Sequence, residues 1–272
     1  MNRSILTVPV QRVEAGSASS LQDLLAVEEP LEIRLQGRTV SITMRTPGHD
    51  FELAAGFLFT EGILTSPEQI ERIAFTPPNS NARQTGNSVT VDLKPEVEID
   101  LSRLERHFYL SSSCGVCGKA SIEALEIQGC AILPRAGLVI APETIHGLPD
   151  ALRGAQAVFD RTGGLHAAAL FDRTGRLLAL REDVGRHNAL DKLIGEGFLE
   201  GRAPFVDSMV LVSGRTSFEL VQKCLVAGIS LLAAVGAPSS LAVDLARRFQ
   251  MTLLGFVRQR RFNIYSGGWR IE

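Results

Sequence analysis

The second half of the chain alternates short apolar strands with amphipathic helices, and this alternation restricts the possible folds more than any other feature. Strands are predicted at 208–212, 231–235 and 252–257, with helices between them at 218–227 and 241–249. A hairpin at 167–171 and 177–181 and a helix at 186–194 precede this run. A β–α–β–α–β order predicts a parallel sheet with helices on both faces, so an α/β fold is expected here.

The first half of the chain has the pattern of a small α+β unit. Residues 31–35 and 40–44 alternate apolar and polar side chains around Gln36-Gly37-Arg38, which predicts an antiparallel hairpin. A helix over about 51–58 and another strand at 88–93 follow. We therefore expect three parts: a small α+β domain with an N-terminal hairpin at 1–110, a mobile cysteine loop and connector at 111–130, and an α/β domain at 131–272.

Composition narrows the class of protein. The 272 residues are 45% hydrophobic and 21% charged, which is typical of a globular chain, and the formal net charge is −2. Dispersed basic residues argue against bulk nucleic-acid binding. The N-terminus lacks the apolar core of a signal peptide and no run has membrane-spanning length, so we expect a cytoplasmic protein without a membrane partner. Four cysteines in a reducing compartment do not form a disulfide framework, and Cys130 and Cys224 are expected to be buried.

Cys114 and Cys117 lie two residues apart within a run of serine and glycine. Such a pair can hold a metal, exchange a disulfide or carry a sulfur atom. Structural zinc needs four ligands, and the sequence has no second cysteine pair, although Cys130, Cys224, His166 or His187 could complete a site in space. A thioredoxin-like pair is expected directly after a strand near the amino terminus, which is not its position here. The residues favour an exposed pair that accepts and then releases sulfur, without excluding the other two roles.

Three loops follow the strands of the predicted sheet. Open α/β sheets bind ligands at the carboxyl ends of their strands, and the residues there are small, polar or basic. The first loop, Ser213-Gly214-Arg215-Thr216-Ser217, combines glycine with hydroxyl groups at a helix start, which suits an anion. Residues 236–240 repeat this pattern, and Arg258, Arg260 and Arg261 follow the third strand. Any one loop is an ordinary connection; three at one edge predict a site for a phosphorylated ligand. Neither a Walker lysine loop nor a dinucleotide glycine fingerprint is present.

Two histidines belong to polar turns between strands and helices. His166 begins a predicted strand, and His187 lies in the turn from Arg181 to Asn188. Side chains at such turns converge on pockets where pKa values are easily tuned, although a structural role is equally expected for each. The cases for His49, His107 and His146 are weaker.

The chain resembles the FdhD family of formate dehydrogenase accessory proteins. The resemblance runs in unbroken order from Thr46 to Tyr265 and shows no departure from the family pattern at a motif position. Seven motifs carry it: the cysteine motif; Thr46-Pro47-Gly48 with Glu52-Leu53-Ala54 and Gly56-Phe57-Leu58; Thr162-Gly163-Gly164 with His166; 181–188 with Asp191-Lys192; Ser213-Gly214-Arg215 with Ser217-Phe218-Glu219; Ala237-Pro238-Ser239; and Gly255-Phe256-Val257-Arg258 with Arg261-Phe262-Asn263.

The resemblance implies a sulfur carrier. Such a protein receives sulfur from a cysteine desulfurase as a persulfide and passes it to the molybdenum cofactor, in its bis-molybdopterin guanine dinucleotide form, before insertion into formate dehydrogenase. It also implies a second domain similar to the cytidine-deaminase fold without its zinc site, a homodimer, and binding of guanine nucleotide such as GDP. No resident metal is expected.

Residue roles follow from the same resemblance. Cys114 is expected to carry the persulfide, and Cys117 to relay the sulfur or resolve the persulfide. Cofactor contacts are expected from Phe256, Val257, Arg258, Gln259, Arg260 and Arg261, and from Ser213, Gly214, Arg215 and His187. Two alternatives remain open: a non-covalent cofactor chaperone whose cysteines position or ligate the metal centre, and a structural zinc loop.

Overall fold

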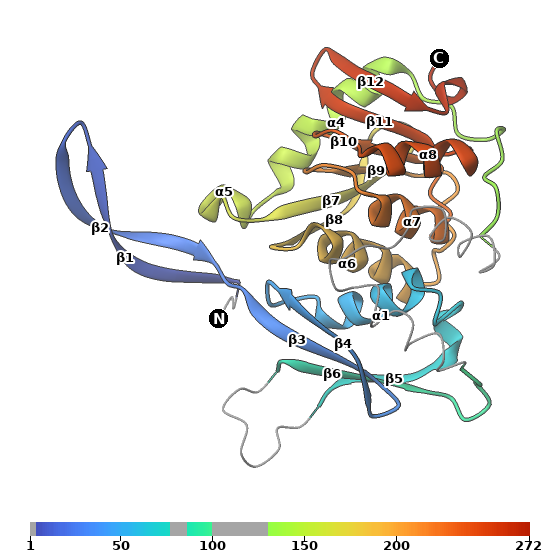
Figure 1. The fold of residues 1–272 in the computed structure, drawn as a ribbon, viewed down its shortest axis with the longest axis horizontal. Helices are drawn as coiled ribbons and strands as arrows, with labels where there is room; N and C mark the ends of the chain where they lie inside the picture. Colours follow the sequence, from blue (N-terminus) through green and yellow to red (C-terminus); the bar gives the residue numbers. More distant parts are fainter. Residues whose placement is uncertain (1–3, 77–85, 100–129) are drawn as a thin grey trace.

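The computed structural model describes residues 4–76, 86–99 and 130–272, which form two sheets with flanking helices and a projecting arm (Figure 1). No helix in these ranges is both long enough and apolar enough to cross a membrane. The protein thus combines helices with mixed sheets.

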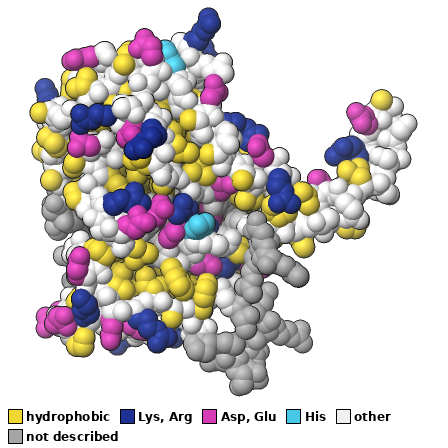
Figure 2. Space-filling view, turned by 180° about the vertical axis from the view of Figure 1, so that it is seen from behind, with side chains coloured by type: hydrophobic (Ala, Val, Ile, Leu, Met, Phe, Trp, Pro, Cys, Tyr) yellow, Lys and Arg dark blue, Asp and Glu magenta, His cyan; other side chains and the backbone are white. Residues whose placement is uncertain are grey.

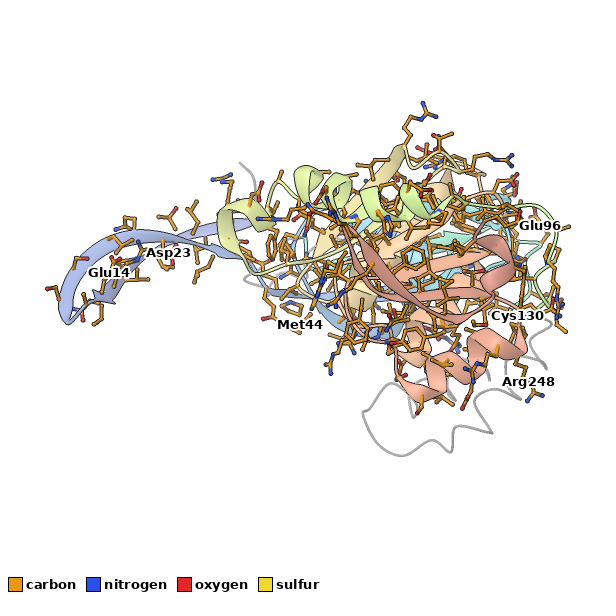
Figure 3. All side chains as sticks on the ribbon, turned by 90° about the horizontal axis from the view of Figure 1, so that it is seen from above. Glu14, Asp23, Met44, Glu96, Cys130 and Arg248 are labelled. Atoms are coloured by element: carbon orange, nitrogen blue, oxygen red, sulfur yellow. The ribbon has the colours of Figure 1, made fainter. Side chains whose placement is uncertain are left out.

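The arm is a hairpin at the amino terminus. Its strands β1 (Ile5–Glu14) and β2 (Ser17–Ala26) pair antiparallel without a register shift, and Ala15 and Gly16 form the turn with positive φ. The arm extends away from the body and from both sheets (Figures 1 and 2). Seen from above, Glu14 lies near its tip, whereas Cys130 and Arg248 lie at the opposite end of the molecule (Figure 3).

The hairpin predicted at 31–35 and 40–44 is confirmed and belongs to a four-stranded sheet. The sheet has the order β4-β3-β6-β5, from β3 (Glu29–Leu35), β4 (Arg38–Arg45), β5 (Ile70–Phe75) and β6 (Ser88–Leu93). Leu31, Ile33 and Leu35 alternate along β3 and are fully buried, as expected for one covered face. The predicted helix is α1 (Asp50–Thr60), and a short 3₁₀ turn, η1 (Pro67–Gln69), leads into β5.

The second sheet has six strands in the order β12-β11-β10-β9-β7-β8. The predicted parallel strands are confirmed as β9 (Met209–Val212), β10 (Leu231–Ala234) and β11 (Thr252–Arg258). The expectation of a parallel sheet holds only for these three, because β7 (His166–Phe171) pairs antiparallel with β8 (Leu177–Asp183) and β9, and β12 (Arg261–Ser266) pairs antiparallel with β11. The sheet is therefore mixed.

Helices cover both faces of this sheet. α6 (Arg186–Leu199), α7 (Phe218–Val226) and α8 (Ser240–Arg248) share one hydrophobic cluster with Val210 and Val212, while α4 (Pro142–Ala155) packs on the other face with Met209 and Leu211. Both crossover helices of the β–α–β–α–β run thus lie on the same face, and α4 supplies the second layer. The short helices α5 (Phe159–Thr162) and η2 (Gly268–Arg270) complete the described elements.

Two glycines bring α1 and α6 into backbone contact. A Cβ atom at Gly56 would lie 1.9 Å from the carbonyl oxygen of Asp191, and one at Gly195 would lie 1.9 Å from that of Glu52. The close crossing joins the two sheets, because one hydrophobic cluster runs from Leu31 and Val89 through both helices to Val210. The division into ranges 1–110, 111–130 and 131–272 stays a prediction.

Candidate functional site

The predicted cysteine pair, Cys114 and Cys117, lies outside the described residues, as does His107. Just after Cys130, the amide of Leu133 donates a hydrogen bond to the carbonyl of Phe249 at 3.0 Å. The fully buried guanidinium of Arg270 donates to the carbonyl oxygens of Pro134 and Gln250. Leu133 and Pro134, just after the predicted cysteine loop, are therefore held against the end of α8 and against η2.

The two remaining cysteines are poor nucleophiles. Cys224 is fully buried, as predicted, whereas Cys130 is only half-buried. Burial raises the pKa of both thiols, which disfavours the reactive thiolate. Within the described ranges, no three His, Cys, Asp or Glu side chains gather as a metal site would require.

The structure brings the three predicted loops together at the carboxyl ends of β9, β10 and β11. The amide of Gly236 donates to the carbonyl of Gly214 at 3.0 Å, and the amide of Phe256 donates to the carbonyl of Gly236 at 3.0 Å. A Cβ atom at Gly236 would lie 2.9 Å from the Gly214 carbonyl oxygen, so the spacing requires glycine. The loops thus form one continuous backbone surface, which we call the carboxyl edge.

Ser213 and His166 meet at the carboxyl edge. The Ser213 hydroxyl accepts a 2.9 Å hydrogen bond from the amide of Ala167, which ties β9 to β7. The His166 ring lies against Gly214, where a Cβ atom would approach Nδ1 to 3.3 Å. Burial and the charge of Arg186 lower the pKa of His166, although Asp183 opposes them. The net effect favours the neutral form of this imidazole.

His187 lies in the first turn of α6 and faces the start of α7. Its Nε2 is 3.2 Å from the hydroxyl of Ser217, the residue before α7, and 3.9 Å from the carboxylate of Glu219. Burial, followed by Arg186 and Lys223, lowers the pKa of His187 to about 4. A neutral ring can exchange donor and acceptor roles with a hydroxyl or a ligand oxygen.

The charge of Arg186 lowers the pKa of both His166 and His187. The buried Nε of Arg186 has no hydrogen-bond partner within the described part of the chain, and the hydroxyl of Thr216, which is 1% exposed, also has none there. Buried donors without partners are uncommon in native proteins. An oxyanion placed at this edge would satisfy such donors, and Arg215 is exposed beside them.

The segment from Phe256 to Arg261 is a β-hairpin: the strand predicted at 252–257 is confirmed, and the arginines expected after it lie at the end of β11, in the turn and at the start of β12. Arg258 still belongs to β11 and Arg261 begins β12, so Gln259 and Arg260 form the turn. Arg258 donates to the carbonyl of Val235 at 3.2 Å, and Gln259 donates to the carboxylate of Asp150 on α4 at 3.0 Å. Val257 is fully buried. Arg260 and Arg261 are exposed, as is Arg258.

Phe256 has an unusual backbone within this hairpin. Its φ is 54°, in the left-handed region that bulky residues avoid, and its side chain is 38% exposed. Its amide is held by Gly236 at the carboxyl edge. Strained residues of this kind concentrate at functional sites. The expected cofactor contact of Phe256 stays a prediction.

Buried ion pairs beneath the carboxyl edge connect three helices. Lys223 on α7 lies 2.9 Å from Glu61 and 3.0 Å from Asp191 on α6, and it donates to Thr60 on α1 at 2.9 Å. Burial opposes the ammonium charge, but the two carboxylates outweigh burial and raise the pKa of Lys223. No sequence pattern marks this network, because its members are far apart along the chain.

A second network fixes the loop between β4 and α1. The Lys192 ammonium lies 2.7 Å from the Asp183 carboxylate and donates to the carbonyl of Thr46 at 2.8 Å; the Thr46 amide donates to Asp183 at 3.1 Å. Lys192 and Asp183 are almost completely buried. This places the Thr46-Pro47-Gly48 and 181–188 motifs side by side.

These two motifs line a cavity of about 460 Å³ between the two sheets. His49 lies at its rim with φ of 58°, and its Nδ1 is 3.1 Å from Glu52, whose carboxylate accepts from Arg181 at 2.6 Å. Burial opposes ionisation of Glu52, but the hydrogen bonds from His49 and Arg181 lower its pKa to about 2. The sequence analysis gave His49 only a weak case. A histidine three residues before a glutamate at a helix start is the pattern that indicates this ion pair.

Known proteins similar to this chain are named as sulfur carriers and as a formate dehydrogenase accessory protein. Relatives named Sulfur carrier protein FdhD include one from Streptomyces avermitilis, 51% identical over 96% of this chain and 94% of the relative, and one from Mycobacterium tuberculosis, 48% identical over 96% of each. A crystal structure assigned to a formate dehydrogenase accessory protein from Desulfotalea psychrophila aligns with a TM-score of 0.76 and 27% identity, covering 98% of this chain and 99% of that one.

A family model described as the FdhD/NarQ family matches residues 26–272. The chain belongs to this family, which confirms the resemblance carried by its motifs.

Proposed function

We propose that this protein is a sulfur carrier required for formate dehydrogenase activity. It takes sulfur from a cysteine desulfurase as a persulfide on Cys114 and delivers it to the molybdenum cofactor before that cofactor enters formate dehydrogenase. The similarity to sulfur carrier proteins at 48–51% identity over 96% of the chain carries this proposal. The similarity to a formate dehydrogenase accessory protein over nearly the whole fold supports formate dehydrogenase as the enzyme that receives the cofactor.

The chemistry needs two thiols. The Cys114 thiolate attacks the outer sulfur of the desulfurase persulfide; a new sulfur–sulfur bond forms, the old one breaks, and the desulfurase thiolate leaves. Delivery as sulfide requires two electrons, because the carried sulfur is formally neutral. Attack of the Cys117 thiolate on Cys114 Sγ supplies them: the pair becomes a disulfide and hydrosulfide leaves toward the metal centre. A dithiol reductant then restores the pair.

The carboxyl edge is the proposed site for the guanine dinucleotide of the cofactor. The unpartnered Nε of Arg186, the two neutral imidazoles and the exposed Arg215 suit the oxygens of a pyrophosphate. Among the residues expected to contact the cofactor, Arg258 and Gln259 donate to Val235 and Asp150, whereas Arg260 and Arg261 have no side-chain partner within the described ranges. Ser213 and Gly214 shape the backbone between them.

Further parts of the proposal concern context. We propose a homodimer that works in the cytoplasm, and we propose that the α/β part shares the cytidine-deaminase fold without its zinc site. The second functional candidate is a non-covalent cofactor chaperone, in which the cysteines only position or ligate the molybdenum centre. The similarity to relatives named as sulfur carrier proteins favours the carrier.

A labelling experiment separates the candidates. The protein is incubated with a cysteine desulfurase and cysteine bearing radioactive sulfur, and the label on the protein is measured without reductant. The carrier requires labelling that is lost in Cys114→Ala and kept in Cys130→Ala, a matched control because the Cys130 thiol is half-buried with a raised pKa. Normal formate dehydrogenase activation by a wild-type protein that takes up no label, or by an unlabelled Cys114→Ala variant, would leave the chaperone as the better account.

A further inference from the structure

The carboxyl edge continues onto the start of α6. Because β7 pairs antiparallel with both β8 and β9, β8 runs parallel to β9 and ends at the same edge of the sheet. α6 begins shortly after β8, and α7 and α8 begin after the loops that follow β9 and β10. These three helices lie side by side on one face (Figure 1), so their N-termini meet at the carboxyl edge. Helix N-termini favour anions, as do the unpartnered donors of Arg186 and Thr216.

One carboxylate lies in this anion-binding setting. Among α6, α7 and α8, only α7 carries an acidic residue in its first turn, Glu219. Its side chain is 58% exposed, and within the described ranges its one ion-pair contact is His187, at 3.9 Å. Burial opposes ionisation of Glu219, but the hydrogen bond from the Ser217 hydroxyl, followed by its own amide and by nearby positive charge, lowers its pKa. The carboxylate is therefore ionised near neutral pH.

A carboxylate beside a phosphate site is unfavourable unless the ligand also brings hydrogen-bond donors, because like charges repel. A carboxylate accepts hydrogen bonds and donates none. Guanine presents two parallel donors on its Watson–Crick edge, the ring N1–H and the amino group at C2, spaced to meet the two oxygens of one carboxylate. Adenine has a lone pair at N1, which a carboxylate repels. A carboxylate in this place thus separates the two purines by attraction and by repulsion.

We propose that Glu219 selects the base of the nucleotide at the carboxyl edge: its two carboxylate oxygens accept the N1–H and the amino group of guanine, while the phosphates lie against the guanidinium groups of the same edge. The hydroxyl of Ser217, which is 3.2 Å from Nε2 of His187, positions the carboxylate. This inference rests on the guanine-nucleotide binding proposed above and names the residue that reads the base.

Calorimetric titration of the full chain with four nucleoside diphosphates tests this role. The wild-type protein should bind guanosine diphosphate about tenfold more tightly than inosine diphosphate, which lacks the amino group, and should bind adenosine and xanthosine diphosphates more weakly still. Glu219→Gln should weaken guanosine diphosphate about tenfold and strengthen xanthosine diphosphate. The reason is that the glutamine amide donates to the C2 carbonyl of xanthine, while its oxygen still accepts from N1–H.

Glu143→Gln is the matched control. Glu143 is an exposed acidic residue at the second position of α4, as Glu219 is in α7, but α4 begins beside η2, where Ile140 pairs with Ile271. Each substitution removes one negative charge from a helix start. A purely structural role of Glu219 therefore predicts the same order of nucleotide affinities in both variants, whereas the proposed role predicts a changed order in Glu219→Gln alone.

The outcomes separate the residue from the site. An unchanged order of affinities in Glu219→Gln overturns the role of Glu219 and leaves the guanine-nucleotide site standing. Equal binding of guanosine and inosine diphosphates by the wild-type protein does the same, and this comparison needs no variant to fold. A wild-type protein that binds none of the four overturns both. Sulfur labelling of Cys114 is measured separately, so loss of base selection and loss of the carrier function are distinguishable.

Discussion

The crossing of α1 and α6 gives the sharpest test of the packing that supports the site. Gly195→Ala places a Cβ atom 1.9 Å from the Glu52 carbonyl oxygen and 2.8 Å from the amide nitrogen of Gly56. Carbon and oxygen atoms in close contact lie about 3.3 Å apart or more, so the helices must separate by more than about 1 Å. Because backbone and not a flexible side chain must move, we take the upper end of overpacking costs, about 3 kcal/mol.

Alanine also improves the helix itself, which offsets part of that cost. The gain over glycine in a helix interior is about 1 kcal/mol, so Gly195→Ala should lower the free energy of unfolding by about 2 kcal/mol. The matched control is Gly147→Ala in α4, where a Cβ atom would meet nothing within 4 Å. That variant should instead stabilise the protein by about 0.5–1 kcal/mol.

Urea denaturation followed by circular dichroism measures both variants, with the transition midpoint compared at equal slope. Opposite signs are expected for the two alanines. If Gly195→Ala stabilised the protein as Gly147→Ala does, α1 and α6 would not cross at backbone contact, and the account of how the two sheets join would be wrong.

Three further predictions concern the carboxyl edge and its support. The pKa of His187 is about 4, against an ordinary value of 6.5, so between these pH values the unfolded chain binds more protons than the folded chain. The free energy of unfolding should therefore fall as the pH drops from about 6.5 to 4, and His187→Gln should flatten this dependence. An imidazole that titrates near 6.5 by NMR would contradict the burial of this ring. Lys223→Met should cost about 3–5 kcal/mol in urea unfolding because it leaves Asp191 and Glu61 uncompensated. The exposed pair of Arg173 and Asp207 offers the control, where Arg173→Gln should cost at most about 1 kcal/mol. Replacing Arg260 and Arg261 by glutamine should weaken binding of guanosine diphosphate about tenfold or more by calorimetry while sulfur loading of Cys114 persists; unchanged affinity would move the nucleotide away from this hairpin.

The central strands could be predicted because each one satisfies a local rule. β9 and β10 are short runs that are buried on both faces, and Ser239 caps α8 by accepting from the Ala242 amide at 3.2 Å. Strand direction at the sheet edges could not be predicted in this way. β12 pairs with β11 through a hairpin whose turn, Gln259-Arg260, lacks the glycine or asparagine that usually marks one.

The β1–β2 arm could not be predicted from local sequence rules either. β2 begins with Ser17-Ala18-Ser19-Ser20, which has low strand propensity, and Pro9 interrupts the pattern of β1. These strands pair over ten residues because the Ala15-Gly16 turn sets their register. Only a structure shows that the resulting hairpin leaves the body.

Part of the candidate site followed from topology and part did not. Parallel strands end at a common edge, so the sequence could place Ser213, Gly236 and Phe256 together. The approach of His166 to Gly214 depends on β7 pairing with β9, and the contact of Lys223 with Thr60 joins residues 163 positions apart. Such contacts arise from tertiary packing and leave no periodic signal.

Mass spectrometry of the peptide containing Cys114 to Lys119 tests the central claim most directly. The protein is incubated with a cysteine desulfurase and cysteine, alkylated without reductant and digested. The account predicts a mass increase of one sulfur atom on this peptide, retained in Cys117→Ala and absent from Cys114→Ala. A peptide that stays unmodified in the wild-type protein while the desulfurase turns over would contradict the proposal that this chain carries sulfur.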